Sequence, residues 1–289
     1  IYSTHPTKEL AEIMLKDSTG VLTKEAVRDG VEALYTEEDA ARAMIFWEGR
    51  NYGEEITIGS QLSDNLVVTF RNAGHVLGSA MVEVKYGKKK LLFSGDLGNA
   101  FNPLMYGFEK ISGVNYLIVE ATYGDRSHED LAEKKLKLER VIERSVVQGG
   151  VLMIPAFSLE RTQELLWEIT DMLKNKQIPN IPIFLDSPLA IRASQVYQKY
   201  HSYLNKINIK SDSFSFLKLK NVTQTLSTEE SKSINNAPSP KIIIAGSGMS
   251  TGGRILHHER RYLQDPKSTI LFVGYQAPGS PGSAAGTDR

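Results

Sequence analysis

Short apolar segments alternate with amphipathic helical patterns in the second part of this chain, and that alternation limits the folds it can adopt. After residue 120 the strand-like runs are residues 150–155, 182–186, 241–246 and 269–274. Apolar residues spaced three or four apart predict the helices that accompany them, at residues 129–147, 160–174, 189–205 and 253–263. Strand and helix in alternation predict an α/β fold with a parallel sheet and crossover helices.

The first part of the chain has a different pattern. Helical patterns over residues 7–17 and 37–48 precede runs of strand length, which are residues 65–70, 80–86, 90–93 and 116–120. Short turns join these runs, so we expect an antiparallel sheet with one solvated face. The change of pattern predicts a domain boundary near residue 125.

Two segments lack a strong period. Residues 211–240 are rich in Ser, Thr, Asn and Lys, and predict a surface excursion with one short helix from Thr228. Residues 277–289 are mostly Gly, Pro, Ser and Ala without an apolar face, so we expect a disordered tail or a remnant of an expression vector. Because the first residue is Ile1 and not methionine, we interpret the sequence as the interior of a longer chain.

Composition excludes several classes of protein. Lys and Arg total 34 and Asp and Glu total 34, so the formal net charge is zero and a polyanion would have to bind at a local patch. The chain has no cysteine, which excludes disulfide frameworks, thiolate metal sites and a cysteine nucleophile, and fits a cytoplasmic location. Apolar runs are far shorter than the roughly 18 residues of a membrane span, so we expect no membrane partner.

Three candidate ligands or catalytic groups lie at strand ends in the first part. His75 lies in the glycine-punctuated segment Asn72–Ala80, where a rigid scaffold can present a ligand. Asp96 follows an apolar strand within Phe93–Gly98, and Glu120 ends another. A structural alternative stays open for each, such as an internally bonded histidine or an aspartate in an Asx-turn.

Two junctions in the second part place serine before a helix. Ser158 and Ser187 are predicted N-caps, and Pro188 suits the first helical position. A third junction, Gly246–Gly253, is a loop of small residues. Such a loop can expose backbone N–H groups at a helix start and bind an anion, although a flexible loop without a ligand is the alternative.

The helix expected after this loop begins near Arg254 and carries two adjacent histidines. His257 and His258 point about 100° apart on a helix, so they cannot both face one ion. We interpret both as solvated or facing phosphate.

Taken in order, these segments resemble the β-CASP branch of the metallo-β-lactamase superfamily. This branch includes bacterial ribonuclease J and the cleavage factor of messenger RNA 3′ ends. Gly74–Ala80 and Phe93–Gly98 resemble its third and fourth metal motifs, and Glu120–His128 resembles the acidic motif that precedes the β-CASP domain. The three strand-to-helix junctions match as well, so the resemblance extends to about Gln276.

The resemblance implies a partial metallo-β-lactamase αββα sandwich over residues 1–125 and an inserted parallel-sheet β-CASP domain over residues 126–276. It implies hydrolysis of RNA phosphodiester bonds with two zinc ions, one bound by His75 and both bridged by Asp96. Glu120 would orient the family's acid/base histidine. RNA would be held through its phosphate backbone with low sequence specificity, by Arg161, Asp186, Ser187, Ser247, Gly248 and Arg254.

The family's HxHxDH motif and its two later histidine motifs have no match in this sequence. We therefore expect this chain alone to bind zinc poorly and to be inactive. Three other functions stay open: a thioester or lactam hydrolase of the same superfamily, which the inserted domain disfavours, a DNA-processing nuclease of the branch, and a catalytically inactive nucleic-acid-binding module. A homodimer is a further candidate partner, because a second copy could supply ligands.

Overall fold

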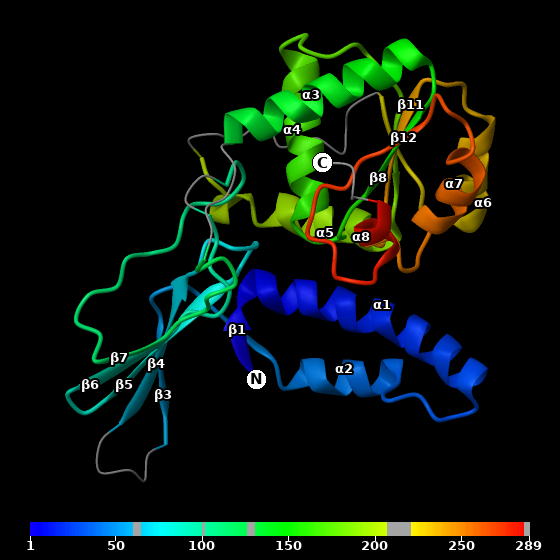
Figure 1. The fold of residues 1–289 in the computed structure, drawn as a ribbon. Helices are drawn as coiled ribbons and strands as arrows, with labels where there is room; N and C mark the ends of the chain where they lie inside the picture. Colours follow the sequence, from blue (N-terminus) through cyan, green and yellow to red (C-terminus); the bar gives the residue numbers. More distant parts are fainter. Residues whose placement is uncertain (60–64, 100–101, 126–130, 207–220, 286–289) are drawn as a thin grey trace. The chain divides into compact units, whose positions relative to one another are not determined.

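A computed structural model describes residues 1–59, 65–99, 102–125, 131–206 and 221–285 (Figure 1). The chain forms two compact units, each described separately below. The first consists of Ile1–Ser127 and Lys199–Ile209, and the second of His128–Gln198 and Lys210–Arg289. The chain therefore leaves the first unit, returns to it briefly and leaves it again.

The first unit starts with a strand and two antiparallel helices. They are β1 (Tyr2–Thr4), α1 (His5–Asp29), α2 (Glu37–Ile45) and β2 (Glu48–Arg50), with β1 and β2 paired in parallel (Figure 1). Helix α1 is longer than the predicted 7–17 segment. It begins at the N-cap Thr4, with Pro6 in its first turn, and ends where Gly30 adopts φ 70°; no further proline follows within the helix.

A five-stranded sheet forms the rest of the first unit. Its order is β3 (Glu55–Ile58), β4 (Leu66–Asn72), β5 (Ala80–Tyr86), β6 (Lys89–Phe93) and β7 (Tyr116–Ile118). The pairs from β3 to β6 are antiparallel, as predicted, but β7 pairs with β6 in parallel. The prediction was wrong for this last pair. Residues 94–115 are long enough to carry the chain from the end of β6 back to the end at which β6 begins, so β7 runs in the same direction as β6.

The second unit contains a five-stranded parallel sheet, which confirms the prediction. Its order is β10 (Val222–Gln224), β9 (Ile183–Asp186), β11 (Lys241–Ala245), β8 (Val151–Pro155) and β12 (Thr269–Ile270). Strand β10 lies inside the predicted surface excursion, and the prediction missed it. The short helix expected there is confirmed as α6 (Thr228–Ser233).

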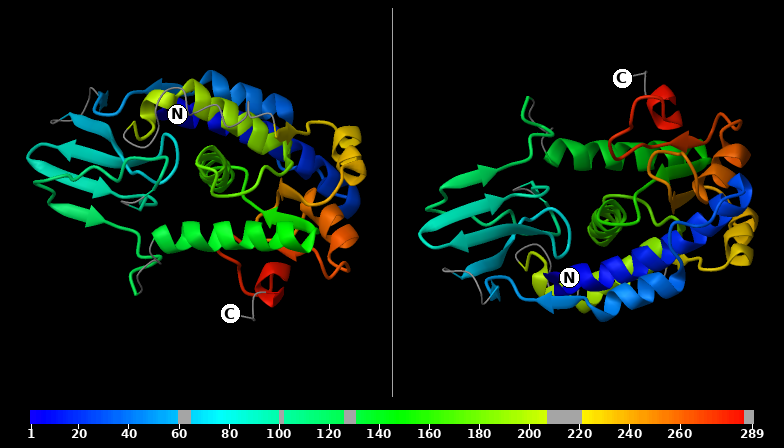
Figure 2. Two further views of the ribbon diagram at one scale, coloured as in Figure 1. Left: turned by 90° about the horizontal axis from the view of Figure 1, so that it is seen from above. Right: turned by 90° about the horizontal axis from the view of Figure 1, so that it is seen from below.

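Helices cover both faces of this parallel sheet. On one side lie α3 (Leu131–Gln148), α4 (Arg161–Lys174) and α5 (Pro188–Lys199), and on the other lie α6 and α7 (Ile255–Tyr262) (Figures 1 and 2). The central strands β8 and β11 are buried throughout, so their side chains form a core on each face. Within the described residues, none of the helices combines the length and the apolar composition of a membrane span.

The C-terminal segment differs from the expected disordered tail. Pro281–Ala285 forms a short helix, α8, and the Ser280 hydroxyl accepts a hydrogen bond from the Ser283 N–H. Proline at the first helical position and serine before it explain the start of this helix. Residues 286–289 lie outside the described part of the chain.

Replacing Ile243 with alanine tests the importance of the β11 core. Ile243 is fully buried between Met153 and Ile255 in one core cluster. We expect Ile243→Ala to lower the free energy of unfolding by about 2–5 kcal/mol, because the cavity adds to the lost burial. Urea unfolding followed by far-UV circular dichroism measures it. Val147→Ala, at an exposed site on α3, is the control; equal midpoints for both variants would contradict this account.

Candidate functional site

His75 and Asp96 face each other at one end of the first unit's sheet. The turn after β4 is fixed by Ser79, whose hydroxyl accepts hydrogen bonds from the His75 N–H at 3.0 Å and the Val76 N–H at 3.1 Å. Asp96 follows β6, and its Oδ2 lies 3.9 Å from His75 Nε2. The imidazole is partly exposed and the carboxylate is exposed, so both remain open to a ligand.

A contact between two glycines sets the separation of these two loops. The Gly98 N–H donates a hydrogen bond to the Ala73 carbonyl at 2.9 Å. A Cβ atom on Gly98 would lie 1.7 Å from the Gly74 carbonyl oxygen, a distance that no side chain can accept. Gly74 also has φ 67°, in the left-handed region. The backbone therefore brings the two loops together.

Glu120 joins the same end of the sheet. Its carboxylate accepts hydrogen bonds from the Leu97 N–H at 2.9 Å and the Thr122 N–H at 3.2 Å. Hydrogen bonds from Thr122 and Leu97, together with the charge of His75, lower the pKa of Glu120. The structure thus brings His75, Asp96 and Glu120 to one end of the sheet, with Glu120 held as an ionised acceptor.

The donors of this group match part of a metal centre. Imidazole nitrogen and carboxylate oxygen are common zinc ligands, and catalytic zinc sites take three protein ligands. Among the described residues, no group of three or more His, Asp or Glu side chains is placed to hold an ion. His75 and Asp96 therefore supply two donors, and these two do not complete a centre.

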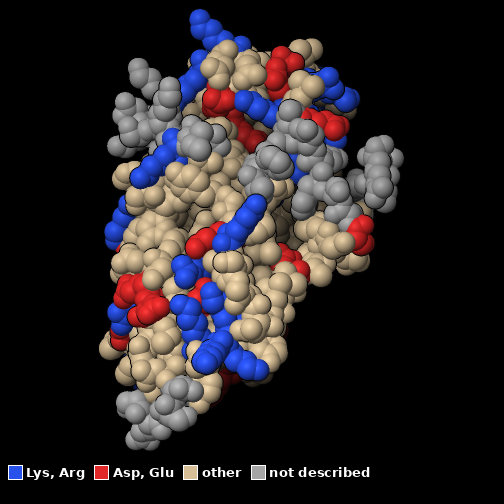
Figure 3. All heavy atoms as spheres, turned by 90° about the vertical axis from the view of Figure 1, so that its left-hand side faces the viewer, with Lys and Arg blue, Asp and Glu red and all other residues tan. Residues whose placement is uncertain are grey.

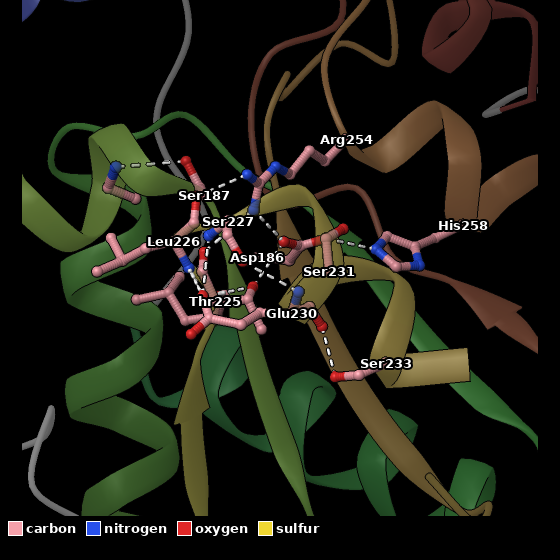
Figure 4. Close-up of polar contacts among 12 residues, drawn as sticks. Asp186, Ser187, Thr225, Leu226, Ser227, Glu230, Ser231, Ser233, Arg254 and His258 are labelled. Atoms are coloured by element: carbon pink, nitrogen blue, oxygen red, sulfur yellow. Dashed lines mark hydrogen bonds and ion pairs between the residues drawn. The ribbon is translucent and has the colours of Figure 1, made fainter. Parts of the chain in front are cut away.

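In the second unit, the carboxylate of Asp186 is the centre of a buried polar network (Figure 4). Asp186 ends β9 and is fully buried. Its Oδ1 accepts hydrogen bonds from Thr225 Oγ1 at 2.6 Å and Arg254 Nη1 at 2.7 Å. Its Oδ2 accepts from Ser231 Oγ at 2.6 Å and bonds His258 Nε2 at 2.7 Å. Both oxygens are therefore satisfied by protein groups.

These bonds keep Asp186 ionised in the interior. Burial by itself raises the pKa of Asp186, but the hydrogen bonds from His258, Ser231, Thr225 and Arg254 hold it well below its usual range. The sequence placed Asp186 among the phosphate-binding residues. Complete burial excludes direct contact with RNA, so Asp186 acts on the surface only through its partners.

Arg254 and His258 also have partners that the sequence did not predict. The Arg254 guanidinium donates to the Thr225 and Leu226 carbonyls as well as to Asp186, and therefore joins the loop after β10 to the start of α7. His258 is buried and stacks on Tyr262, so its interpretation as solvated or phosphate-facing was wrong. His257 is exposed on the same helix.

The loop Gly246–Gly253 is closed by its own hydrogen bonds. The Ser247 N–H donates to the Gly252 carbonyl at 3.0 Å, and the Thr251 N–H donates to Ser247 Oγ at 3.0 Å. The Ile255 N–H, at the start of α7, donates to the Gly246 carbonyl. The N–H groups of Ser247, Thr251 and Ile255 are therefore bonded to protein acceptors and are not available to an anion.

Two hydroxyl groups meet next to this loop. Ser158 Oγ and Ser187 Oγ lie 3.2 Å apart, and we call them the hydroxyl pair. Ser187 caps α5 as predicted, because its Oγ accepts the Ala190 N–H at 3.3 Å. Ser158 is not an N-cap, since α4 begins later, at Arg161, and Glu160 with φ 66° occupies the cap position.

The hydroxyl pair lies at the carboxyl ends of the parallel strands, next to the point where connections leave neighbouring strands toward opposite faces of the sheet. Strands β8 and β11 are neighbours, but the chain passes from β8 to α4 on one face and from β11 to α7 on the other. In open α/β sheets, ligands bind at such a point, outside the carboxyl ends of the strands. The loops at residues 156–160 and 246–253 border this point.

Helix α4 carries three acidic residues between Arg161 and Lys174. Arg161 is partly exposed, and its Nη1 lies 2.7 Å from Glu164 Oε2. Glu168 follows Glu164 by four residues on the same helix face. Burial raises the pKa of Glu168 to about 7, the charge of Glu164 adds to this rise, and Arg161 opposes it.

Comparison with known proteins gives one family match and several relatives. Residues 162–284 match the model described as the Beta-Casp domain. The chain is 34% identical to Ribonuclease TTHA0252 of Thermus thermophilus and 34% identical to an RNase J-like protein of Methanocaldococcus jannaschii, covering 98% of this chain and 63% of each relative. It is 30% identical to the Transcription termination factor FttA of Methanosarcina mazei, covering 44% of that protein. The chain therefore spans less than two thirds of these relatives.

Replacing Asp186 with asparagine tests the buried network. We expect Asp186→Asn to lower the free energy of unfolding by about 3–5 kcal/mol at pH 7, because Arg254 loses its buried counter-charge. Since folding lowers the pKa of Asp186, its stabilisation is present above the unfolded value of about 3.9 and is lost as pH falls below it. Urea unfolding should show the two proteins converging in acid. Glu229→Gln, on the exposed surface of α6, is the control; a pH-independent difference would argue against the carboxylate.

Replacing Glu168 with glutamine tests the raised pKa on α4. A carboxyl whose pKa is raised on folding stabilises the protein when protonated, and this contribution is lost as pH rises from about 4.5 through 7. Relative to wild type, Glu168→Gln should gain up to about 3 kcal/mol between pH 4.5 and pH 8. Urea midpoints at the two pH values measure this gain. Glu143→Gln, exposed on α3, should show none.

Proposed function

Since this chain belongs to the β-CASP branch of the metallo-β-lactamase superfamily, in which two of the reported relatives are named as ribonucleases, we propose that the protein hydrolyses RNA phosphodiester bonds. The observation that carries the proposal is the meeting of His75, Asp96 and Glu120 at one sheet end, from segments that lie apart in the sequence. Relatives at 34% identity are named as ribonucleases, which supports RNA as the substrate.

Nucleases of this family are metal-dependent in general, and we propose zinc as the metal here. His75 and Asp96 would hold it together with ligands from elsewhere. Bound zinc supplies Lewis-acid stabilisation of charge on phosphate oxygens and an activated water. Glu120, ionised and fixed by the Leu97 and Thr122 N–H groups, would hold a proton-transferring histidine in orientation as a hydrogen-bond acceptor.

The first unit's sheet supports the proposal that residues 1–125 are part of a metallo-β-lactamase sandwich. Phe70, Val82, Phe93 and Ile118 lie opposite one another on neighbouring strands, so they share one face. Ile118 is 56% exposed and Tyr116 on the same face is 51% exposed. A sheet face this apolar packs against another layer in a folded domain, as in an αββα sandwich.

In the second unit, which we propose to include the β-CASP domain at residues 126–276, RNA would be held by local groups. Lys and Arg are mixed with Asp and Glu over the face drawn in Figure 3, in keeping with the zero net charge. Arg161 at the start of α4 and the half-buried hydroxyls of Ser158 and Ser247 can contact phosphate oxygens, whereas Ser187 is buried and acts through its contact with Ser158. Such contacts do not read bases, so we propose low sequence specificity.

Zinc content tests the metal part of the proposal. After dialysis against metal-free buffer, we expect elemental analysis to find fewer than one zinc per chain, because two donors do not complete a site. His75→Ala and Asp96→Ala should reduce any retained zinc further, whereas His257→Ala, at an exposed histidine on α7, should not. Two tightly bound zinc ions per chain would show that these residues complete a centre without further ligands.

RNA binding tests the substrate part. Anisotropy of a labelled single-stranded RNA decamer should rise on titration with the chain, and its affinity should fall with salt as phosphate contacts are lost. No cleavage of the decamer is expected from the chain alone, which leaves binding as the readout. Preference for DNA of the same sequence would favour a DNA-processing nuclease, and absence of binding at low salt would sink the proposal.

A further inference from the structure

Phe157 is an exposed aromatic residue on a rigid loop of the second unit. It lies between β8 and α4 and is 42% exposed. Its carbonyl accepts hydrogen bonds from the Thr162 hydroxyl at 2.7 Å and the Thr162 N–H at 3.3 Å. The next carbonyl, of Ser158, accepts from Gln163 Nε2 at 3.0 Å. Single exposed apolar residues are common on protein surfaces, but here hydrogen bonds at two consecutive carbonyls fix the backbone from which the ring projects.

Gly248 and Gly274 lie against one edge of the Phe157 ring. A Cβ atom on Gly248 would lie 2.8 Å from Phe157 Cδ2 and 2.9 Å from the Phe157 backbone nitrogen. A Cβ atom on Gly274 would lie 3.6 Å from Phe157 Cε2. The side-chain amide of Gln276 donates to both glycine carbonyls, at 2.9 and 3.2 Å. Gln276 therefore fixes the positions of both glycines independently of the ring, and a side chain at position 248 would collide with the ring.

The ring stands where a ligand of this fold is expected. Phe157 follows β8 and Gly248 follows β11, so the two loops meet at the point where the topology of the sheet reverses. Ser158, the next residue, carries one hydroxyl of the hydroxyl pair, and Arg161 begins α4 three residues later. An aromatic ring beside hydroxyl and guanidinium donors suits a nucleotide, which has an aromatic base and a phosphate.

We propose that Phe157 stacks on a nucleobase of single-stranded RNA, with Gly248 and Gly274 holding the ring in its stacking position. This assignment rests on the proposed function and adds a base-stacking subsite to it. Every base has a π-face, so the subsite accepts any base and leaves sequence specificity low. Gly248, which the resemblance placed among the phosphate-binding residues, then acts through Phe157 and not by direct contact.

The test compares two RNA decamers that carry the same charge. One is an adenylate decamer labelled with fluorescein, and the other has abasic ribose at every position. Anisotropy titrations of the full chain give the affinity for each. Phe157→Leu, which removes the π-face, should weaken binding of the adenylate decamer by about fivefold to 150-fold and leave the abasic decamer unchanged. Phe157→Trp should retain binding of the adenylate decamer.

Two further variants separate stacking from charge and from folding. Gly248→Ala should resemble Phe157→Leu, because its Cβ displaces the ring. Phe108→Leu, at an equally exposed phenylalanine (42%) of the first unit, should change nothing. The slope of affinity against salt should stay the same in Phe157→Leu, whereas Arg161→Ala should reduce it by about 0.7 as one phosphate contact is lost. Urea midpoints equal to wild type confirm that Phe157→Leu folds.

The outcomes distinguish the two proposals. If wild type binds both decamers equally and Phe157→Leu matches it, the stacking subsite is wrong while RNA binding stands. If wild type binds neither decamer at low salt, the proposed function fails and the subsite fails with it. A base-dependent affinity that disappears in both Phe157→Leu and Gly248→Ala supports the subsite.

Discussion

The hydrogen bonds of the ionised Asp186 carboxylate hold together the loops at the carboxyl ends of the second unit's parallel sheet. A buried charge is costly unless its oxygens are hydrogen-bonded, and here the donors come from segments far from β9 in sequence: the loop after β10, helix α6 and the start of helix α7. Ser187, the next residue, then caps α5 and meets Ser158. The placement of the polar surface groups therefore follows from one buried anion.

The periodicity of apolar residues predicted the strands and helices that bury a continuous apolar surface in the core. Strand β11 is recognisable because Ile242–Ala245 is a continuous apolar run buried on both faces. Strand β10 was missed because it has only three residues at a sheet edge, too few to show a period. The parallel pairing of β7 depends on a long connection, whose path no local pattern encodes.

The order of the motifs along the sequence predicted the candidate residues of the first unit. It did not predict the contacts of Asp186, because these depend on partners distant in sequence. His75, Asp96 and Glu120 were found from their positions after strands, and the structure brings them to one sheet end. Asp186 and Arg254 were predicted as phosphate-binding residues, but the structure bonds them to each other across 68 positions of sequence, which no local pattern encodes. Thr225 and Ser231 gave no signal of their own, although the capping box after Leu226 marked the helix that carries Ser231.

In the first unit, the separation of His75 and Asp96, the two proposed metal donors, is set by backbone in contact with backbone. Because Gly98 lies against Gly74 with no room for a side chain, neither loop can move toward or away from the other without breaking that contact. The distance between the two loops therefore does not depend on which side chains stand at positions 75 and 96. Exchanging carboxylate for imidazole at Asp96, or the reverse at His75, would change which ion the pair prefers while the geometry of the platform stays the same. In the proposed centre, single substitutions at these two positions would therefore shift the preference between softer and harder cations without altering the backbone.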